Sequence, residues 1–302
     1  MSKNILITGG SGLIGSKLTQ LLQTSGFQVS HLSRSTRPHQ TKSFLWNIKE
    51  RTIDASALEG AYAIVHLAGT NVGDKRWTKQ RKQEILNSRL ESTSLLYEEL
   101  KKGNHDVRTF VSASAVGFYG YDHDEHYFTE EDKQGAGFQA NVVGSWERAV
   151  DKIATLGIRV VKLRGGVVLS EKGGALKEMM LPVKLYVGSP LGTGDQMMSW
   201  IHIDDLCRMY IKSIEDEKME GVYNAVAPNP VSNKEFTKLI AKTLKKPIWL
   251  PRVPGFVIKI LFGEMAEVVL KGSMISSEKI EAAEFDFKFV NLEDALTDLL
   301  GK

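Results

Sequence analysis

The sequence predicts an α/β fold in which a parallel β-sheet is covered by helices on both faces. Short apolar runs alternate with amphipathic segments, the first run ends in a glycine turn, and a helical pattern begins directly after that turn. The expected strands are residues 5–8, 28–32, 63–67, 109–112, 159–163 and 222–225, and the expected helices lie near residues 13–22, 79–100, 139–154 and 206–214. This order is typical of a Rossmann-type doubly wound sheet, in which ligands bind at the carboxyl ends of the strands.

The first strand and the first helix enclose the most informative motif of the chain. Ile5, Leu6 and Ile7 are too short a run for a helix, and three glycines follow at spacings of three residues. Such a turn lets main-chain N–H groups at a helix N-terminus approach a pyrophosphate. An ordinary tight turn is the alternative, but strand, glycines and helix in this order favour dinucleotide binding. The residues expected to contact the cofactor here are Thr8, Gly9, Gly12, Leu13, Ile14 and Gly15.

The length of 302 residues suits one large domain with a smaller lobe. We predict a dinucleotide-binding domain over residues 1–165, to which residues 200–227 return with a further helix and strand. Residues 166–199 and 228–302 are expected to form a smaller C-terminal substrate lobe, because residues 165–194 are rich in glycine and proline.

The composition argues against several classes of partner. A net charge of +3 does not indicate nucleic-acid binding, and the single cysteine, Cys207, fits a reducing compartment. No signal peptide is apparent, and Lys259, Glu264 and Glu267 interrupt the most apolar later stretch, so we expect no membrane partner and a cytoplasmic protein. We expect a small-molecule substrate of unknown identity and no bound metal; the oligomeric state is left open.

The residues after the second expected strand predict the cofactor. NAD-binding proteins usually place a carboxylate there to hold the ribose hydroxyls, but this chain has Ser33, Arg34 and Arg37, and no carboxylate before Glu50. An arginine fork matches a 2′-phosphate, so we predict NADP(H) in preference to NAD(H). The alternative is that Arg34 is a solvated loop charge.

Several motifs together resemble the extended short-chain dehydrogenase/reductase superfamily, which includes nucleotide-sugar epimerases and dehydratases. They are the glycine motif at 9–15, His-Leu-Ala-Gly at 66–69, and Val-Ser-Ala-Ser-Ala at 111–115 with Tyr119 and Gly120. More narrowly, the chain resembles the "epimerase family" proteins related to NAD-dependent epimerase/dehydratases. The segments that carry this narrower resemblance are 75–78, 88–89, 145–147, 188–194, 199–202 and 261–264.

The resemblance implies further site residues. Leu67, Ala68 and Gly69 would lie along the cofactor, and Arg89 stands where the superfamily often has an asparagine. The polar and aromatic residues of the narrower motifs are candidate substrate contacts, although both tryptophans can equally be core aromatics. These candidates are Arg76, Trp77, Gln196 and Trp200.

The usual catalytic pattern of the superfamily is incomplete in this chain. Ser114 matches the serine after the expected strand at 109–112, but the helix that should carry Tyr-x-x-x-Lys has Gln139 and Val143 at those positions. Gln139 does not titrate and Val143 carries no charge, so neither can transfer the proton. Tyr97 and Lys101 have the right spacing, but they belong to a different helix.

Tyr119 is the candidate replacement for the missing acid, with a wall of the pocket as the alternative role. The histidines and carboxylates of residues 121–127 can be interpreted as a metal or acid/base cluster, but a solvated loop is favoured. Arg164 would bind an anion or form a structural ion pair. The resemblance places His202 and the two residues Asp204 and Asp205 near the pocket, and the alternative is that Asp204 or Asp205 caps the following helix.

Two main functions therefore remain open, beside a weaker third, a structural assembly subunit. One is an NADP-dependent oxidoreductase or epimerase that acts on a carbonyl or nucleotide-sugar-type substrate, with Ser114 and Tyr119 as catalytic residues. The other is a non-catalytic NADP(H)-binding redox sensor or partner-binding module, which the missing tyrosine and lysine favour.

Overall fold

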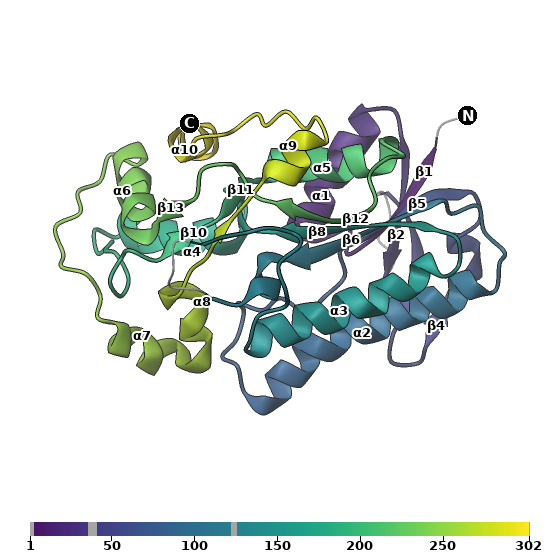
Figure 1. The fold of residues 1–302 in the computed structure, drawn as a ribbon, viewed down its shortest axis with the longest axis horizontal. Helices are drawn as coiled ribbons and strands as arrows, with labels where there is room; N and C mark the ends of the chain where they lie inside the picture. Colours follow the sequence, from purple (N-terminus) through teal and green to yellow (C-terminus); the bar gives the residue numbers. More distant parts are fainter. Residues whose placement is uncertain (1–2, 36–40, 122–125, 302) are drawn as a thin grey trace.

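An eight-stranded β-sheet forms the centre of the molecule (Figure 1). The computed structural model describes residues 3–35, 41–121 and 126–301. The strand order is β12-β8-β6-β5-β1-β2-β3-β4, and all neighbours are parallel except β3 and β4. The bounds are β1 Asn4–Thr8, β2 Gln28–Ser33, β3 Lys42–Asn47, β4 Thr52–Ile53, β5 Ala61–His66, β6 Thr109–Ala115, β8 Arg159–Gly165 and β12 Gly221–Ala225. The predicted α/β class and Rossmann-type doubly wound architecture are confirmed.

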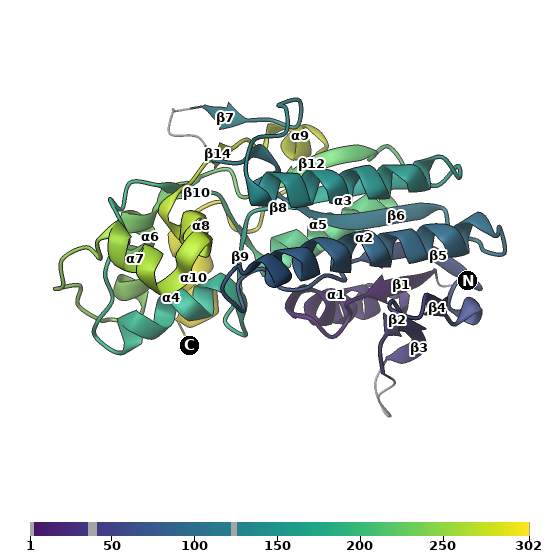
Figure 2. The ribbon, with the colours of Figure 1, turned by 90° about the horizontal axis from the view of Figure 1, so that it is seen from below.

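Helices cover both faces of this sheet. The helices α1 (Leu13–Thr24) and α5 (Ile203–Glu215) pack on one face, and α2 (Lys79–Lys101) and α3 (Phe138–Ala154) lie side by side on the other (Figure 2). Successive β1 side chains alternate between the two cores: Ile5 and Ile7 pack on the α1 side and Leu6 on the α2 side. Both faces are therefore buried, which explains why the strands are continuous apolar runs.

The chain reverses direction across the sheet between β1 and β5. From β1 it proceeds outward through β2, β3 and β4, and then returns to the other side of β1 with β5. The loops that follow β1 and β5 start at neighbouring strand ends and consequently run in opposite directions, away from each other. This is the topological switch point at which open α/β sheets bind their ligands.

Several elements had no counterpart in the sequence prediction. Strands β3 and β4 extend the sheet beyond β2, and a 3₁₀ turn, η1 (Ala55–Ala57), follows them. Helix α5 begins three residues earlier than expected, because His202 Nδ1 accepts the N–H of Asp204 at 3.1 Å and caps the helix. The prediction that Asp204 or Asp205 is the cap is therefore wrong.

The remaining elements form a second group around the core residues Leu176, Trp200 and Phe236. Most of them lie at the left-hand end of the molecule in Figures 1 and 2. Their bounds are β9 Val167–Leu169, α4 Gly174–Lys184, β10 Met197–Met198, β11 Trp200–His202, β13 Val231–Ser232, α6 Asn233–Thr243, α7 Gly255–Phe262, η3 Gly263–Met265, α8 Ala266–Leu270 and α10 Leu292–Leu300.

The C-terminal part does not stay within this second group. Strand β14 (Met274–Ile275) pairs with β7 (Tyr127–Phe128), and α9 (Glu278–Ala282) packs against β12. Ile280 and Phe285 join the core on the α1 side of the sheet. We retain the division near residue 165 as a proposal, with the segment 274–287 as a second return to the sheet.

No helix within the described residues is both long and apolar enough to cross a membrane.

Candidate functional site

The glycine loop after β1 brings the start of α1 close to the strand end. Gly12 N–H donates to Gly9 O at 3.0 Å, and a Cβ at Gly15 would lie 2.4 Å from the same oxygen. Gly9 adopts φ +71°, and a Cβ there would meet the Leu67 backbone at 3.0 Å. The first turn of α1 has neither a side-chain cap nor an acidic residue, so its N–H groups remain open to an anion.

Thr8 and His66 hold the loops after β1 and β5 together. Thr8 Oγ1 accepts the N–H groups of Leu67 and Ala68, both at 3.1 Å, and lies 2.8 Å from His66 Nδ1. Thr8 is fully buried. Its hydroxyl therefore positions the loop that carries Leu67, Ala68 and Gly69.

The end of β2 presents the predicted phosphate contact to solvent. Ser33 is half-buried and Arg34 is exposed, and no hydrogen bond or ion pair with another described residue occupies the Arg34 guanidinium. Arg37 lies outside the described residues. The arrangement leaves Arg34 available for an anion.

Arg89 contributes a second cation beside the β5 loop. Its Nη1 donates to the carbonyls of Thr70 at 3.1 Å and Ile85 at 2.9 Å, and its guanidinium carbon lies 3.3 Å from the position of a Cβ at Gly69. Burial lowers its pKa to about 10. Within the described residues no carboxylate pairs with Arg89, so its charge is uncompensated next to the switch point.

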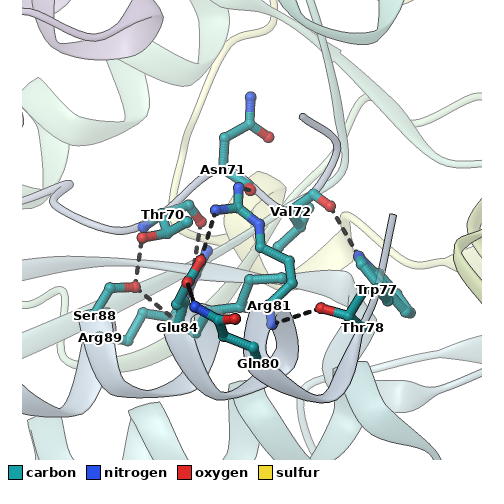
Figure 3. Close-up of polar contacts among 11 residues, drawn as sticks. Thr70, Asn71, Val72, Trp77, Thr78, Gln80, Arg81, Glu84, Ser88 and Arg89 are labelled. Carbon is teal, nitrogen blue, oxygen red and sulfur yellow. Dashed lines mark hydrogen bonds and ion pairs between the residues drawn. The ribbon is translucent and has the colours of Figure 1, made fainter. Parts of the chain in front are cut away.

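Hydrogen bonds within the loop from Thr70 to Thr78, and between this loop and α2, hold the loop in place (Figure 3). Arg81 Nη2 donates to Asn71 O at 2.7 Å, and Trp77 Nε1 donates to Val72 O at 2.9 Å. Thr78 caps α2 by accepting the N–H of Arg81 at 3.1 Å. The Asn71 side chain points away from the helix in this view.

The four predicted substrate contacts do not share one environment. Arg76 is exposed, donates to Ile260 O at 3.2 Å and lines a pocket of about 380 Å³ with Trp77 and Phe262. Trp77 and Trp200 are both buried in core clusters, and Trp200 Nε1 donates to Asn229 O. Gln196 Nε2 donates to two carbonyls, while its Oε1 is buried without a partner. A role in substrate binding stays a prediction for all four.

Ser114 lies at the carboxyl end of β6 and belongs to a buried polar network. Its hydroxyl donates to Glu147 Oε1 at 2.5 Å, and Arg164 binds both oxygens of that carboxylate, at 2.9 and 2.8 Å. Glu147 and Arg164 are 5% and 3% exposed. Because a serine hydroxyl has one proton to donate, Ser114 presents only lone pairs to a ligand in this arrangement.

Tyr119 occupies the other end of the same network. Its hydroxyl donates to Asn224 Oδ1 at 2.7 Å and accepts from Arg164 Nη1 at 2.8 Å. Burial raises its pKa to about 12, and Arg164 and Asn224 only partly offset that effect. The side chain is 3% exposed. Tyr119 is therefore a buried member of the network, and both catalysis by Tyr119 and its alternative role as a wall of the pocket stay predictions.

Gln139 and Val143 lie on the first turns of α3, as the sequence predicts. Gln139 Oε1 accepts the hydroxyl of Tyr121 at 2.6 Å, and Val143 is buried. The central residues of the loop at 121–127 lie outside the described residues. The described residues contain no group of three or more His, Cys, Asp and Glu side chains that could hold a metal ion.

Sequence reasoning missed Glu147 and Asn224 and left Arg164 undecided between an anion site and an ion pair. The structure resolves Arg164 as the partner of Glu147. The available signal was a carboxylate within the amphipathic stretch of α3 and an arginine at the end of an apolar strand. Charged residues are rarely buried unless they are paired.

The fold and the loops at its switch point define a doubly wound α/β protein of the dinucleotide-binding type. A family model described as "NAD dependent epimerase/dehydratase family" matches residues 5–225, and one described as a domain of unknown function, DUF1731, matches residues 253–299. The chain belongs to the NAD-dependent epimerase/dehydratase family.

Relatives of similar length support this assignment. The chain is 36% identical to the epimerase family protein YfhF of Bacillus subtilis, over 99% of this chain and 98% of the relative. It is 35% identical to the epimerase family protein SAR0825 of Staphylococcus aureus, over 99% and 100%.

Solved structures agree with the fold. A crystal structure of the human epimerase family protein SDR39U1 (isoform2) with NADPH superposes with a TM-score of 0.88 at 32% identity, covering 98% of this chain and 99% of that one. A nucleoside-diphosphate sugar epimerase from Corynebacterium glutamicum gives 0.82 at 34% identity, covering all of this chain and 59% of that longer one.

Proposed function

We propose that this protein is an NADP(H)-dependent oxidoreductase or epimerase that acts on a carbonyl or nucleotide-sugar-type substrate without the Tyr-x-x-x-Lys pair. The observation that carries the cofactor choice is the end of β2, where Arg34 is exposed and unpaired among the described residues and no carboxylate takes the usual NAD position. The NADPH in the crystal structure of human SDR39U1 supports the same choice.

The residues in the crevice at the switch point, where the loops after β1 and β5 diverge, suit such a cofactor. The open N-terminus of α1 would bind the pyrophosphate, and Arg34 would bind the 2′-phosphate. Arg89, whose charge is uncompensated, would bind a further negative group. When bound, the nicotinamide supplies hydride transfer. Ser114, with its proton engaged by Glu147, would accept a hydrogen bond from a substrate hydroxyl and orient that oxygen.

Removing the Arg34 guanidinium tests the cofactor choice. We expect Arg34→Ala to weaken NADPH binding roughly 10- to 100-fold, the value of one or two charged hydrogen bonds, and to leave NADH binding unchanged. Titration calorimetry with both nucleotides measures this. Arg51→Ala, in the turn between β3 and β4, is the matched control. Wild-type protein that binds NADH as tightly as NADPH would contradict the proposal.

The missing tyrosine and lysine favour a second function, a non-catalytic NADP(H)-binding sensor or partner-binding module. A panel of carbonyl compounds and nucleoside-diphosphate sugars, each mixed with protein and NADPH, separates the two. Loss of the nicotinamide absorbance or conversion of a sugar, abolished in Ser114→Ala, supports the enzyme. Tight NADPH binding with no conversion of any compound favours the sensor.

A further inference from the structure

Exposed apolar side chains gather at one end of the molecule. Fourteen large apolar side chains are exposed among the described residues, and eleven of them come from residues 181–187 and 249–269. On the surface of a monomeric soluble protein such side chains usually occur singly, whereas a contiguous group of them marks an interaction surface.

The two segments that carry these side chains are joined to each other. Trp249 Nε1 donates to Tyr186 O at 3.0 Å, and Val253 N–H donates to Pro190 O at 2.9 Å. Both views place α7 and the chain that leads to it at the left-hand end of the molecule, opposite β1–β4 (Figures 1 and 2). We call residues 181–192 and 245–262 together the lobe tip.

Helix α7 is the most exposed apolar element of the lobe tip. Ile258 is buried, whereas Phe256, Ile260 and Leu261 are 66%, 68% and 59% exposed. Its eight residues read Gly-Phe-Val-Ile-Lys-Ile-Leu-Phe. A helix this short cannot span a bilayer, but its apolar side chains have the length and position to enter an interface lying parallel to it.

The lobe tip is also positively charged. Residues 242–263 contain five cations and no carboxylate, and residues 179–194 contain Lys184 and no carboxylate. Three nearby carboxylates are already paired: Glu264 with Lys82, Glu267 with Lys271, and Glu293 with Lys242. Glu178 and Asp195, which flank residues 179–194 directly, form no ion pair with any other described residue. Lys184, Lys245, Arg252 and Lys259 form no ion pair with any other described residue.

We propose that the lobe tip binds the surface of a membrane that contains anionic lipids, with its apolar side chains in the interface and its cations on the lipid phosphates. This proposal reverses the expectation from the sequence that the protein has no membrane partner. Charge argues against a second copy of the chain, because two-fold pairing of this face would oppose cations without a carboxylate between them. Trp249 and Tyr186, which are 66% and 50% exposed, are of the types enriched at membrane interfaces. The proposal is independent of the cofactor.

Flotation of the full chain with lipid vesicles tests this proposal. We expect binding to vesicles of phosphatidylcholine mixed with phosphatidylglycerol, weaker binding to pure phosphatidylcholine, and release by added salt. Neutralising two cations, as in Arg252→Gln with Lys259→Gln, should lower the partition coefficient roughly 30-fold, because each cation near the surface contributes about fivefold. Ile260→Ser with Leu261→Ser should lower it at least about tenfold.

Matched control residues lie at the opposite end of the molecule, on and beside the sheet strand β3. Leu45 on β3 is 49% exposed and Lys49 is also exposed, so Leu45→Ser with Lys49→Gln changes the same kinds of side chain away from the lobe tip. Unchanged melting temperature and NADPH affinity show that every variant is folded.

Three results would overturn the proposal. They are absence of binding to the anionic vesicles, equal binding to pure phosphatidylcholine, and an equal loss in the control variant. If light scattering instead shows a dimer that Ile260→Ser with Leu261→Ser dissociates, and no vesicles bind, the face holds a second copy.

Discussion

His66 shows how one buried side chain sets the geometry of the crevice. Thr8 Oγ1 accepts two backbone N–H groups and so donates its own proton to His66 Nδ1, which leaves Nε2 as the donor toward Ser92 and Thr93 at 3.3 and 3.2 Å. Burial, with the nearby charge of Arg89, lowers the pKa of His66 to about 3. The imidazole therefore remains neutral in the folded protein at physiological pH.

This shift predicts an acid-dependent loss of stability. In the unfolded chain His66 takes up a proton near its ordinary pKa of about 6.5, whereas in the folded protein it does so only near 3. Its contribution is present above about pH 6.5 and is lost as the pH falls toward 3, with a slope of up to about 1.4 kcal/mol per pH unit.

Urea denaturation at several pH values measures that slope. We expect His66→Gln to be destabilised at neutral pH and to lose the corresponding part of the pH dependence. His126→Gln, at an exposed histidine, serves as the control. If the pH dependence of His66→Gln matches that of the wild type, the buried neutral imidazole is excluded as its source.

The element formed by β1, the glycine loop and α1 depends on the absence of side chains. A Cβ at Gly15 would lie 2.4 Å from Gly9 O and 2.7 Å from Gly10 Cα. Both are main-chain atoms, so the loop itself would have to move. Its N–H groups would then no longer point at a common phosphate position.

We therefore expect Gly15→Ala to weaken NADPH and NADH binding equally, by roughly tenfold or more, which corresponds to about 1.4 kcal/mol. Gly73→Ala is the control, because its added Cβ meets nothing nearer than 3.7 Å. Calorimetric titration provides both affinities. Wild-type affinities in Gly15→Ala would show that the pyrophosphate binds elsewhere.

At the scale of elements, the sequence predicted best those helices and strands whose hydrophobic pattern is long and regular. Helices α2 and α3 match their predicted ranges to within a residue, because 23 and 17 residues show the helical period over several turns. Strands β4 and β10 have two residues each and no readable period. Strand β10 forms only by pairing with β13, which is distant in the sequence, and β4 forms by pairing with β3 across a short turn.

Asp205 connects the C-terminal segment to the rest of the molecule. It is fully buried on α5, accepts the N–H groups of Lys288 at 3.0 Å and Phe289 at 2.9 Å, and pairs with Arg208 at 2.8 Å. Helix α10 follows directly after this contact. One carboxylate therefore joins α5, which covers the sheet, to the end of the C-terminal lobe.

Truncating this carboxylate should loosen the C-terminal segment. We expect Asp205→Ala to lower the free energy of unfolding by about 3 kcal/mol, because two buried N–H groups lose their acceptor, and to make the chain after about residue 285 the first site of limited proteolysis. The adjacent Asp204→Ala removes only a surface pair with Lys17 and should cost less than about 1 kcal/mol. Equal losses in the two variants would contradict this account.

At the scale of the whole molecule, the sequence by itself determined the sheet class, the glycine loop and the family. These depend on local periodicity or on residues at fixed spacing. Only the tertiary structure decided that Ser114 donates to Glu147, that Trp77 and Trp200 are core residues, and that the apolar residues of α7 face solvent. The physical reason is that each of these depends on contacts, or on their absence, between segments far apart in the chain, and no local pattern records which side chain meets which.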